Sequence, residues 1–187
     1  MDLISVLFSA FGLSASAGLN AYIPLLVVSL LAKYTDAIQL AEPWDALTSW
    51  WVIGVLIVLS IVEFVADKVP AVNHINDIIQ SFVRPAAGAV LFVSNSAVVE
   101  EIHPVLAIIA GLVVAGGVHV GKSAMLRPAV TATTGGAGTP AVSLAEDIIA
   151  ALISILAVVI PVIIAAIIIV VTSTFVWWLW RRSNLRA

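Results

Sequence analysis

The residues Gly18–Pro24, GLNAYIP in one-letter code, interrupt the first long apolar segment of the chain, Leu3–Ala32. The proline lacks a backbone N–H and removes a hydrogen bond from a helix, while Asn20 and Tyr22 bring polar atoms to the same turn. The stretch therefore predicts a helix that is broken or re-entrant inside a membrane, where such breaks form sites for ions and solutes. A plain kink, with Asn20 bonding to a neighbouring helix, is the alternative.

The composition extends this interpretation to the whole chain. Of the 187 residues, 62% are hydrophobic and only 10% are charged, and the mean hydropathy is +1.17. A soluble domain carries about 25% charged residues, so this chain could not cover its surface in water. We expect one integral membrane domain over residues 1–187, with the lipid bilayer as its surroundings. The small net charge of -3 argues against nucleic acid, and the lack of cysteine excludes disulfides and thiolate chemistry.

Apolar blocks along the chain predict an all-α, polytopic transmembrane bundle with about six crossings. The blocks are Leu3–Ala32, Trp50–Val65, Ile75–Val93, Pro104–Leu126 and Leu144–Trp180. A crossing needs about 20 residues, so the last block is long enough for two, with Pro161 near the turn between them. A second broken or re-entrant helix is expected near Pro140–Ile149. Both termini are expected in the cytoplasm, because that topology places most Lys and Arg residues inside.

Acidic residues lie at unusual places in these apolar blocks. Glu63 and Asp67 are four residues apart and share a helix face, where one carboxyl tends to hold a proton unless a cation is near. Asp77 and Asp147 each follow a Pro-Ala-Val sequence, seven residues after its proline. Helix capping explains some of their neighbours, and Ser143 with Glu146 reads as a capping box. The residues predicted to handle protons or cations are Glu63, Asp67, Asp77 and Asp147.

Basic residues fall on two further helical faces. Arg84 extends a polar stripe with Gln80 and Ser81, and Lys122 shares a face with Arg127. A polar stripe within a membrane must face other helices or water, so these bases point to the interior of the bundle. The residues predicted to bind substrate are Asn20, Tyr22, Arg84, Lys122 and Arg127.

A metal site stays open as a further hypothesis. Carboxylates and imidazoles are ligands for a divalent ion such as manganese or magnesium. No spacing in the sequence dictates such a site, so the cofactor is left unassigned, with a divalent cation as the candidate. The candidate ligands are Glu63, Asp67, His74, Asp77, His119, Glu146 and Asp147.

Two longer motifs resemble a known family. GLSASAGLNAYIPL over residues 12–25 resembles its N-terminal signature, and EFVADKVP over residues 63–70 with RPAAG over residues 84–88 resembles its middle signature. The family is the 4126 family, small bacterial integral membrane proteins that carry a domain of unknown function. The resemblance implies a helical fold in the bacterial cytoplasmic, or inner, membrane, and it supplies no reaction. At Asn73 the family pattern would have an aspartate.

The leading functional hypothesis is a small transporter or channel-like permease for a small ion or an anionic solute. One alternative is a membrane enzyme or binding protein for a lipid phosphate, which would use the basic residues and the loop of glycines and threonines at residues 131–140. Another is a structural accessory subunit. The sequence has no tight catalytic signature, which favours a protein that is not an enzyme. Association into a homo-oligomer is left open.

Overall fold

The computed structural model describes residues 3–66, 70–160, 170–175, 177–178 and 181. Within these residues the regular elements are helices, which confirms the all-α prediction. They are α1 (Leu3–Leu19), α2 (Tyr22–Tyr34), η1 (Trp44–Thr48), α3 (Trp50–Ala66), α4 (Pro70–Val93), α5 (Ser96–Glu101), α6 (Pro104–Gly121), η2 (Lys122–Leu126), α7 (Arg127–Thr134) and α8 (Thr139–Val159). η1 is a short 3₁₀ helix and η2 is a π-helical turn.

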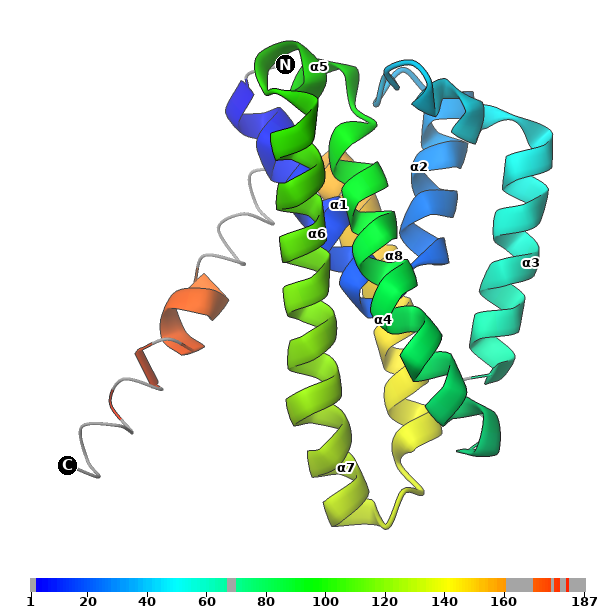
Figure 1. The fold of residues 1–187 in the computed structure, drawn as a ribbon, viewed down its shortest axis with the longest axis vertical. Coiled ribbons are helices and arrows are strands. Elements are labelled where there is room, and N and C mark those ends of the chain that lie inside the picture. The colour runs from blue at the N-terminus through cyan, green and yellow to red at the C-terminus, as the bar shows by residue number, and fades with distance from the viewer. Residues whose placement is uncertain (1–2, 67–69, 161–169, 176, 179–180, 182–187) are drawn as a thin grey trace.

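The first apolar segment turns back on itself at the predicted break. α1 ends at Leu19, α2 begins at Tyr22, and the outer ends of both helices lie at the upper end of the bundle in Figure 1. Val6 in α1 accordingly lines the same pocket as Asp36, which follows α2. The break at Gly18–Pro24 is confirmed. The segment is a helical hairpin, so it does not supply one helix running from end to end of the molecule.

The remaining long helices alternate between the two ends of the bundle. α3 leads from the upper to the lower end, α4 returns, α6 descends and α8 returns (Figure 1). Backbone hydrogen bonds tie the upper end together: Ala41 N–H donates to the carbonyl of Ser94 at 2.8 Å, and Ser96 N–H donates to that of Gln39 at 2.9 Å. The connection between α2 and α3 is thereby fixed against the start of α5.

Two helical stretches are long and apolar enough to cross a membrane, Pro104–Thr134 and Thr139–Val159. Tyr22–Tyr34 and Trp50–Ala66 are apolar but shorter. These helices agree with a membrane protein, while the count of about six crossings is not confirmed. Of the last predicted block, α8 ends at Val159, and Pro161 lies outside the described residues.

α4 and α6 run antiparallel and approach closely because small residues face each other. A Cβ atom added to Gly111 of α6 would lie 2.6 Å from the Cα of Ala89, and one added to Gly88 of α4 would lie 2.8 Å from the carbonyl oxygen of Gly111. α1 approaches the same helix, since a Cβ at Gly18 would lie 2.5 Å from the carbonyl oxygen of Ala115. Three backbones therefore meet at these glycines, as in membrane bundles built on small residues.

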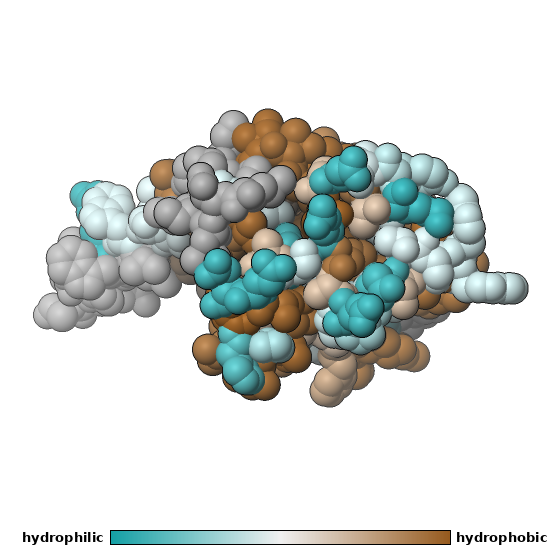
Figure 2. Space-filling model, turned by 90° about the horizontal axis from the view of Figure 1, so that it is seen from above, coloured by the Kyte–Doolittle hydropathy of each residue, from teal (hydrophilic) through white to brown (hydrophobic). Residues whose placement is uncertain are grey.

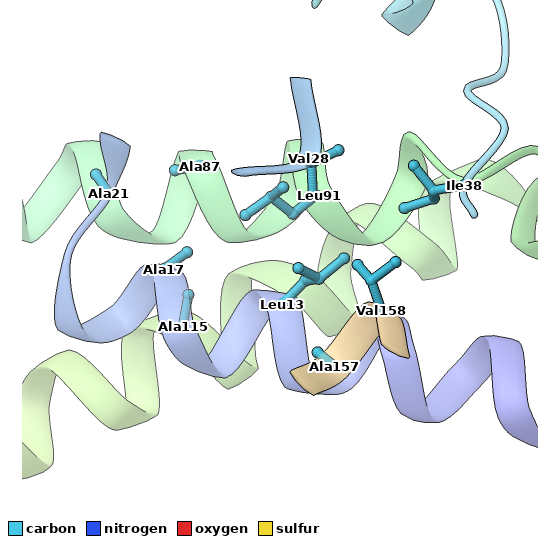
Figure 3. Close-up of a cluster of buried hydrophobic side chains, with 10 residues drawn as sticks. All are labelled: Leu13, Ala17, Ala21, Val28, Ile38, Ala87, Leu91, Ala115, Ala157 and Val158. Atoms are coloured by element: carbon cyan, nitrogen blue, oxygen red, sulfur yellow. The ribbon is translucent and has the colours of Figure 1, made fainter. Parts of the chain in front are cut away.

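The main apolar core lies beside this contact, where α1, α2, α4, α6 and α8 meet. Figure 3 shows its buried side chains, half of which are alanines. They are Leu13, Ala17, Ala21, Val28, Ile38, Ala87, Leu91, Ala115, Ala157 and Val158. Because Ala21 is fully buried, the turn between α1 and α2 is enclosed by the bundle.

Replacing Gly111 tests the close contact of α4 with α6. Gly111→Val places methyl groups against the backbone of α4, so we expect a loss of about 1–3 kcal/mol in the free energy of unfolding. Gly117→Val on the same helix is the matched control, since a Cβ there meets no atom within 4 Å. Reversible unfolding in mixed detergent micelles measures both variants. Equal stabilities would contradict the described contact.

α8 begins earlier than the capping box predicts. The helix starts at Thr139, with Pro140 in its first turn, where a proline needs no N–H partner. Ser143 and Glu146 are consequently buried inside the helix rather than placed at its start, so the capping-box interpretation is wrong. α8 is also continuous across Pro140–Ile149, so the helix is not broken there.

Candidate functional site

Asn20 organises the break between α1 and α2 with both polar atoms of its side chain. Its Oδ1 accepts hydrogen bonds from the backbone N–H groups of Tyr22 and Ile23, each at 3.0 Å, and so caps the first turn of α2. Its Nδ2 donates to Oδ1 of Asp147 on α8 at 2.9 Å. Asn20 is 1% exposed, so these backbone groups are satisfied by protein atoms within the bundle.

Lys122 provides a hydrogen-bond donor to the end of α1, on the other side of the same break. Its Nζ donates to the carbonyl of Leu19, the last residue of α1, at 3.0 Å. In an unbroken helix Ile23 would donate to that carbonyl, but its N–H is held by Asn20. The ammonium group also lies 2.6 Å from Oε2 of Glu146 on α8. Lys122 begins the π-helical turn η2, a rare form that occurs often at functional sites.

Polar groups continue along the face of α8 that meets α1. Ser16 Oγ lies 2.7 Å from the carbonyl oxygen of Ala150 and 2.8 Å from Oγ of Ser154. Asp147, Ala150 and Ser154 are spaced three and four residues apart and so lie on one helix face. The hairpin of α1 and α2 is therefore joined to α8 by several buried hydrogen bonds around the break.

On the other side of the hairpin a buried ion pair joins α3 to α4, and the same arginine contacts α6. Arg84 Nη2 donates to Oε1 of Glu63 at 2.9 Å, and both side chains are 1% exposed. Arg84 Nη1 lies 3.2 Å from Nδ1 of His119. Buried charges of this kind cost several kcal/mol unless they are paired and hydrogen-bonded. Arg84 thus holds three helices together through Glu63 and His119.

The hydrogen bonds of His119 define its protonation. Arg84 can only donate, so Nδ1 of His119 accepts and carries no proton. Ser81 Oγ donates its single hydrogen to the backbone carbonyl of Asp77 at 2.8 Å, so Nε2 of His119, 3.1 Å away, must donate to that hydroxyl oxygen. The imidazole is therefore neutral, with its proton on Nε2, and both of its nitrogens are engaged.

Tyr22 connects these two groups of residues. Its backbone N–H is held by Asn20, while its side chain lies close enough to Gln80, Glu63 and Arg84 to interact with them electrostatically. Gln80 precedes Arg84 by one turn of α4. Within the part of the chain that is described, Oε1 of Gln80 and Nε of Arg84 are buried without a hydrogen-bond partner. We call the connected set of Asn20, Tyr22, Glu63, Gln80, Arg84, His119, Lys122, Glu146 and Asp147 the buried polar network.

The buried polar network combines acids and bases. Among the described residues that are buried, Glu63, Glu146 and Asp147 are acids and Arg84 and Lys122 are bases, while His119 is neutral. An isolated charge in such an interior is strongly disfavoured, so the charged groups of the network are held close to one another.

An open cavity of about 450 Å³ lies beside the network at the α4, α6 and α7 faces. Its polar lining includes His119, which contacts Arg84, and Ser81, which contacts His119. Asp77, half-buried on α4, lines the same space. The lining residues are Asp77, Ile78, Ser81, His119, Ser123, Pro128 and Thr131.

Most of the residues singled out from the sequence can be located. Asn20, Tyr22, Arg84 and Lys122, predicted to bind substrate, fall in the buried polar network, as do Glu63 and Asp147. Asp77 lies apart from them, in the wall of the cavity. The remaining candidates lie outside the described residues or have side chains that do: Asp67, His74 and Arg127.

The hypothesis of a divalent metal site finds no ligand set in the described part of the chain. No group of three or more His, Cys, Asp or Glu side chains converges there. Glu63 is instead paired with Arg84. Both ring nitrogens of His119 are engaged by Arg84 and Ser81, so the imidazole has no lone pair for a metal.

Ser16 and Ser154 were not predicted as part of the site. Ser16 lies among small residues near Ser14, and Ser154 is a single hydroxyl in an apolar run, so neither forms a distinctive polar motif. A signal was present in the spacing, because Ser16 precedes Asn20 by four residues and Ser154 follows Asp147 by seven. Both serines therefore extend a helix face that already carries a buried polar residue.

The fold and site define a helical bundle with a broken N-terminal hairpin and a buried polar network. The chain matches the profile of the family described as Domain of unknown function (DUF4126) over residues 7–182, and it belongs to that family. The predicted resemblance is confirmed. The comparisons found no match among curated proteins and none among solved structures. The family description names no activity, so function has to be argued from the site.

Proposed function

We propose that the protein is a small membrane transporter or channel-like permease for a small ion or an anionic solute. The observation that carries the proposal is the buried polar network around the break between α1 and α2. The network gathers carboxyl groups and bases from several helices around this break, and these charged groups could exchange partners with a transported ion. Broken helices with charged residues at the break are a recurring way to build transport sites.

The outer faces of the helices support placing this network inside a bilayer. Large apolar side chains are exposed along α3, α4, α6 and α8, and Trp51 is 88% exposed. A surface of this kind is unfavourable in water but matches lipid. Figure 2 looks onto the upper end, where hydrophilic residues gather between flanks of hydrophobic ones. Further exposed apolar residues are Val55, Val62, Phe82, Leu106, Val113, Ile148 and Leu152.

The charges at the two ends favour an orientation with the lower end in the cytoplasm. Asp36 and Asp45 lie in the connection at the upper end, and Glu100 and Glu101 lie on α5. Arg127 lies at the lower end, where the positive-inside rule places basic residues. In this proposal α3, α4, α6 and α8 cross the bacterial inner membrane, and the hairpin of α1 and α2 enters from the outer side. The start of α1 is then outside, in place of the cytoplasmic N-terminus expected from the sequence.

Flux through purified protein in liposomes tests the proposal. Proteoliposomes would be assayed for protons with an internal pH dye, and for rubidium, manganese, chloride and phosphate as tracers. We expect saturable uptake of one of these ions above that of protein-free liposomes of the same lipid. Uptake equal to that of protein-free liposomes for every ion would contradict transport.

Asp147→Asn is predicted to reduce transport while retaining the fold. The amide can still accept a hydrogen bond from Asn20, so we expect the free energy of unfolding to change by about 1 kcal/mol or less. The variant removes the carboxyl group that exchanges a proton or cation, so we expect flux to fall by about tenfold or more. Flux in the same liposomes and unfolding in detergent measure the two effects. Glu101→Gln, exposed on α5, is the control and should behave as the unaltered protein.

If the protein is instead a structural accessory subunit, flux and stability should respond to Asp147→Asn in the opposite way. If the network only locks helices together, Asp147→Asn should alter stability with no specific effect on flux. The serine contacts of Ser14 with the carbonyl of Gly88 at 2.7 Å and of Ser16 with Ser154 are of this locking kind. They contain no ionisable group, which separates them from the acids and bases assigned to transport.

A further inference from the structure

An open groove of about 520 Å³ runs along the first half of α3, at the outer edge of the bundle next to α2 (Figure 1). From this groove and the charged group at its upper end, we propose that the protein binds an anionic phospholipid, with an acyl chain in the groove and the phosphate at Lys33. The inference goes beyond the proposed transport. It rests on the placement of α3 in a bilayer, and the binding is measured without any flux.

The shape and the lining of the groove suit a hydrocarbon chain. A Cβ atom added to Gly54 would meet no atom within 4 Å, so this glycine leaves the helix face open between its larger neighbours one turn away. Below the tryptophans the lining side chains are aliphatic, and they offer a polar ligand no hydrogen-bond partner. The lining residues are Trp50, Trp51, Gly54, Val55, Val58 and Leu59.

Lys33 at the end of α2 places a positive charge at the upper end of this groove. Its Nζ lies 4.7 Å from the centre of the Trp50 ring and donates to the carbonyl of Thr48 at 2.8 Å. Both partners are neutral, so within the described part of the chain the ammonium is positioned without being paired to a carboxylate. An ammonium group has three hydrogens, so Lys33 can donate to a phosphate while it keeps its bond to Thr48.

Aromatic side chains place this end of the groove at the boundary between membrane and water. The Tyr34 ring packs edge-on against Trp50 with 6.4 Å between the ring centres, and both rings are exposed beside Trp51. Tyrosine and tryptophan are enriched at the depth of the lipid headgroups, where a phosphate would meet Lys33.

Acidic residues near the same end favour a lipid over a free anion. Asp36, Glu42 and Asp45 lie in the connection between α2 and α3, so a dissolved phosphate would be repelled as well as attracted. An acyl chain held in the groove adds apolar contact that a free phosphate lacks. We therefore assign the site to a phospholipid rather than to its headgroup alone.

Native mass spectrometry of the purified full chain in detergent, titrated with lipid, tests the inference. The probes are dioleoyl phosphatidylglycerol, which is anionic, and dioleoyl phosphatidylcholine, which has the same chains and no net charge. Glycerol phosphate serves as a headgroup without chains. We expect the first phosphatidylglycerol to bind about fivefold more tightly than phosphatidylcholine, and glycerol phosphate to bind far more weakly than either lipid.

Two pairs of variants separate the headgroup from the chain. Lys33→Gln removes the charge and should bring the two lipids to similar affinity, whereas Lys33→Arg keeps the charge and should retain the preference. Gly54→Leu fills the groove and should weaken both lipids. Gly117→Leu on α6 is its matched control, because a Cβ atom there also meets no atom within 4 Å.

Three results would overturn the lipid site. They are equal affinity of the unaltered protein for the two lipids, a preference that survives intact in Lys33→Gln, and equal lipid binding by Gly54→Leu and Gly117→Leu. Each would mean that lipid contacts the helices only as part of the surrounding bilayer. Ion uptake by a protein that fails these tests would leave the proposed transport standing. Lipid binding that depends on Lys33 and Gly54 in a protein without uptake would support the site and count against transport.

Discussion

Replacing Arg84 with alanine is expected to destabilise the protein more than any other change considered, by about 3–5 kcal/mol in the free energy of unfolding. Arg84 is 1% exposed and pairs with Glu63 at 2.9 Å, so its removal leaves a buried carboxylate without its cation. It also removes the donor to Nδ1 of His119. Reversible unfolding in mixed detergent micelles measures the loss, provided that the variant is purified in a folded state.

A double-mutant cycle separates the ion pair from the packing of the long side chain. Arg84→Met with Glu63→Gln removes both charges and keeps most of the volume, so it should recover much of the stability lost in Arg84→Met alone. Because neutral replacement of a complete buried pair is often tolerated, recovery is the expected result. If the double variant is no more stable than the single one, the described ion pair does not account for the loss.

Asn20→Leu is expected to have the second largest effect, with a loss of about 2–4 kcal/mol. The leucine has a similar size but cannot accept from the N–H groups of Tyr22 and Ile23, nor donate to Asp147. These groups are enclosed by the bundle, where water does not replace the lost bonds. The same break carries the transport proposal, so we also expect flux to fall to the level of empty liposomes.

Asn20→Asp and Gln39→Leu provide the matched controls for this position. An aspartate can still cap α2 through its carboxylate oxygens, but it faces Asp147, so its stability should depend on pH more steeply than that of the unaltered protein. Gln39→Leu makes the same kind of amide-to-apolar change at an exposed site and should leave stability and flux unchanged. A fully stable Asn20→Leu variant would exclude a capping role for this side chain.

The sequence predicted the break in the first segment because its cause is local. Pro24 prevents a backbone hydrogen bond, and Asn20 is polar at the same turn, so both signals lie within one short stretch. It did not predict that the chain turns back there. Reversal depends on contacts from distant helices, such as Lys122 with the carbonyl of Leu19 and Asn20 with Asp147.

The candidate site was predictable as a list of residues but not as a set of partners. A charge within an apolar helix can be recognised alone, which singled out Glu63, Arg84 and Lys122. Their pairing follows from the packing of α3 on α4 and from the ion pair that joins η2 to α8, which no periodicity encodes. The capping-box prediction was wrong because Glu146 matches a local motif of helix starts, whereas in the folded protein it pairs with the distant Lys122.

Ion uptake by proteoliposomes of the unaltered protein and of Asp147→Asn, measured side by side, tests whether the buried polar network has a role in transport. We expect saturable uptake of a small ion that exceeds the leak of protein-free liposomes and falls by about tenfold or more in the variant. We also expect both proteins to remain equally folded in the same preparation. Uptake that is absent for every ion, or that is the same in both proteins, would contradict a transport role for the buried polar network.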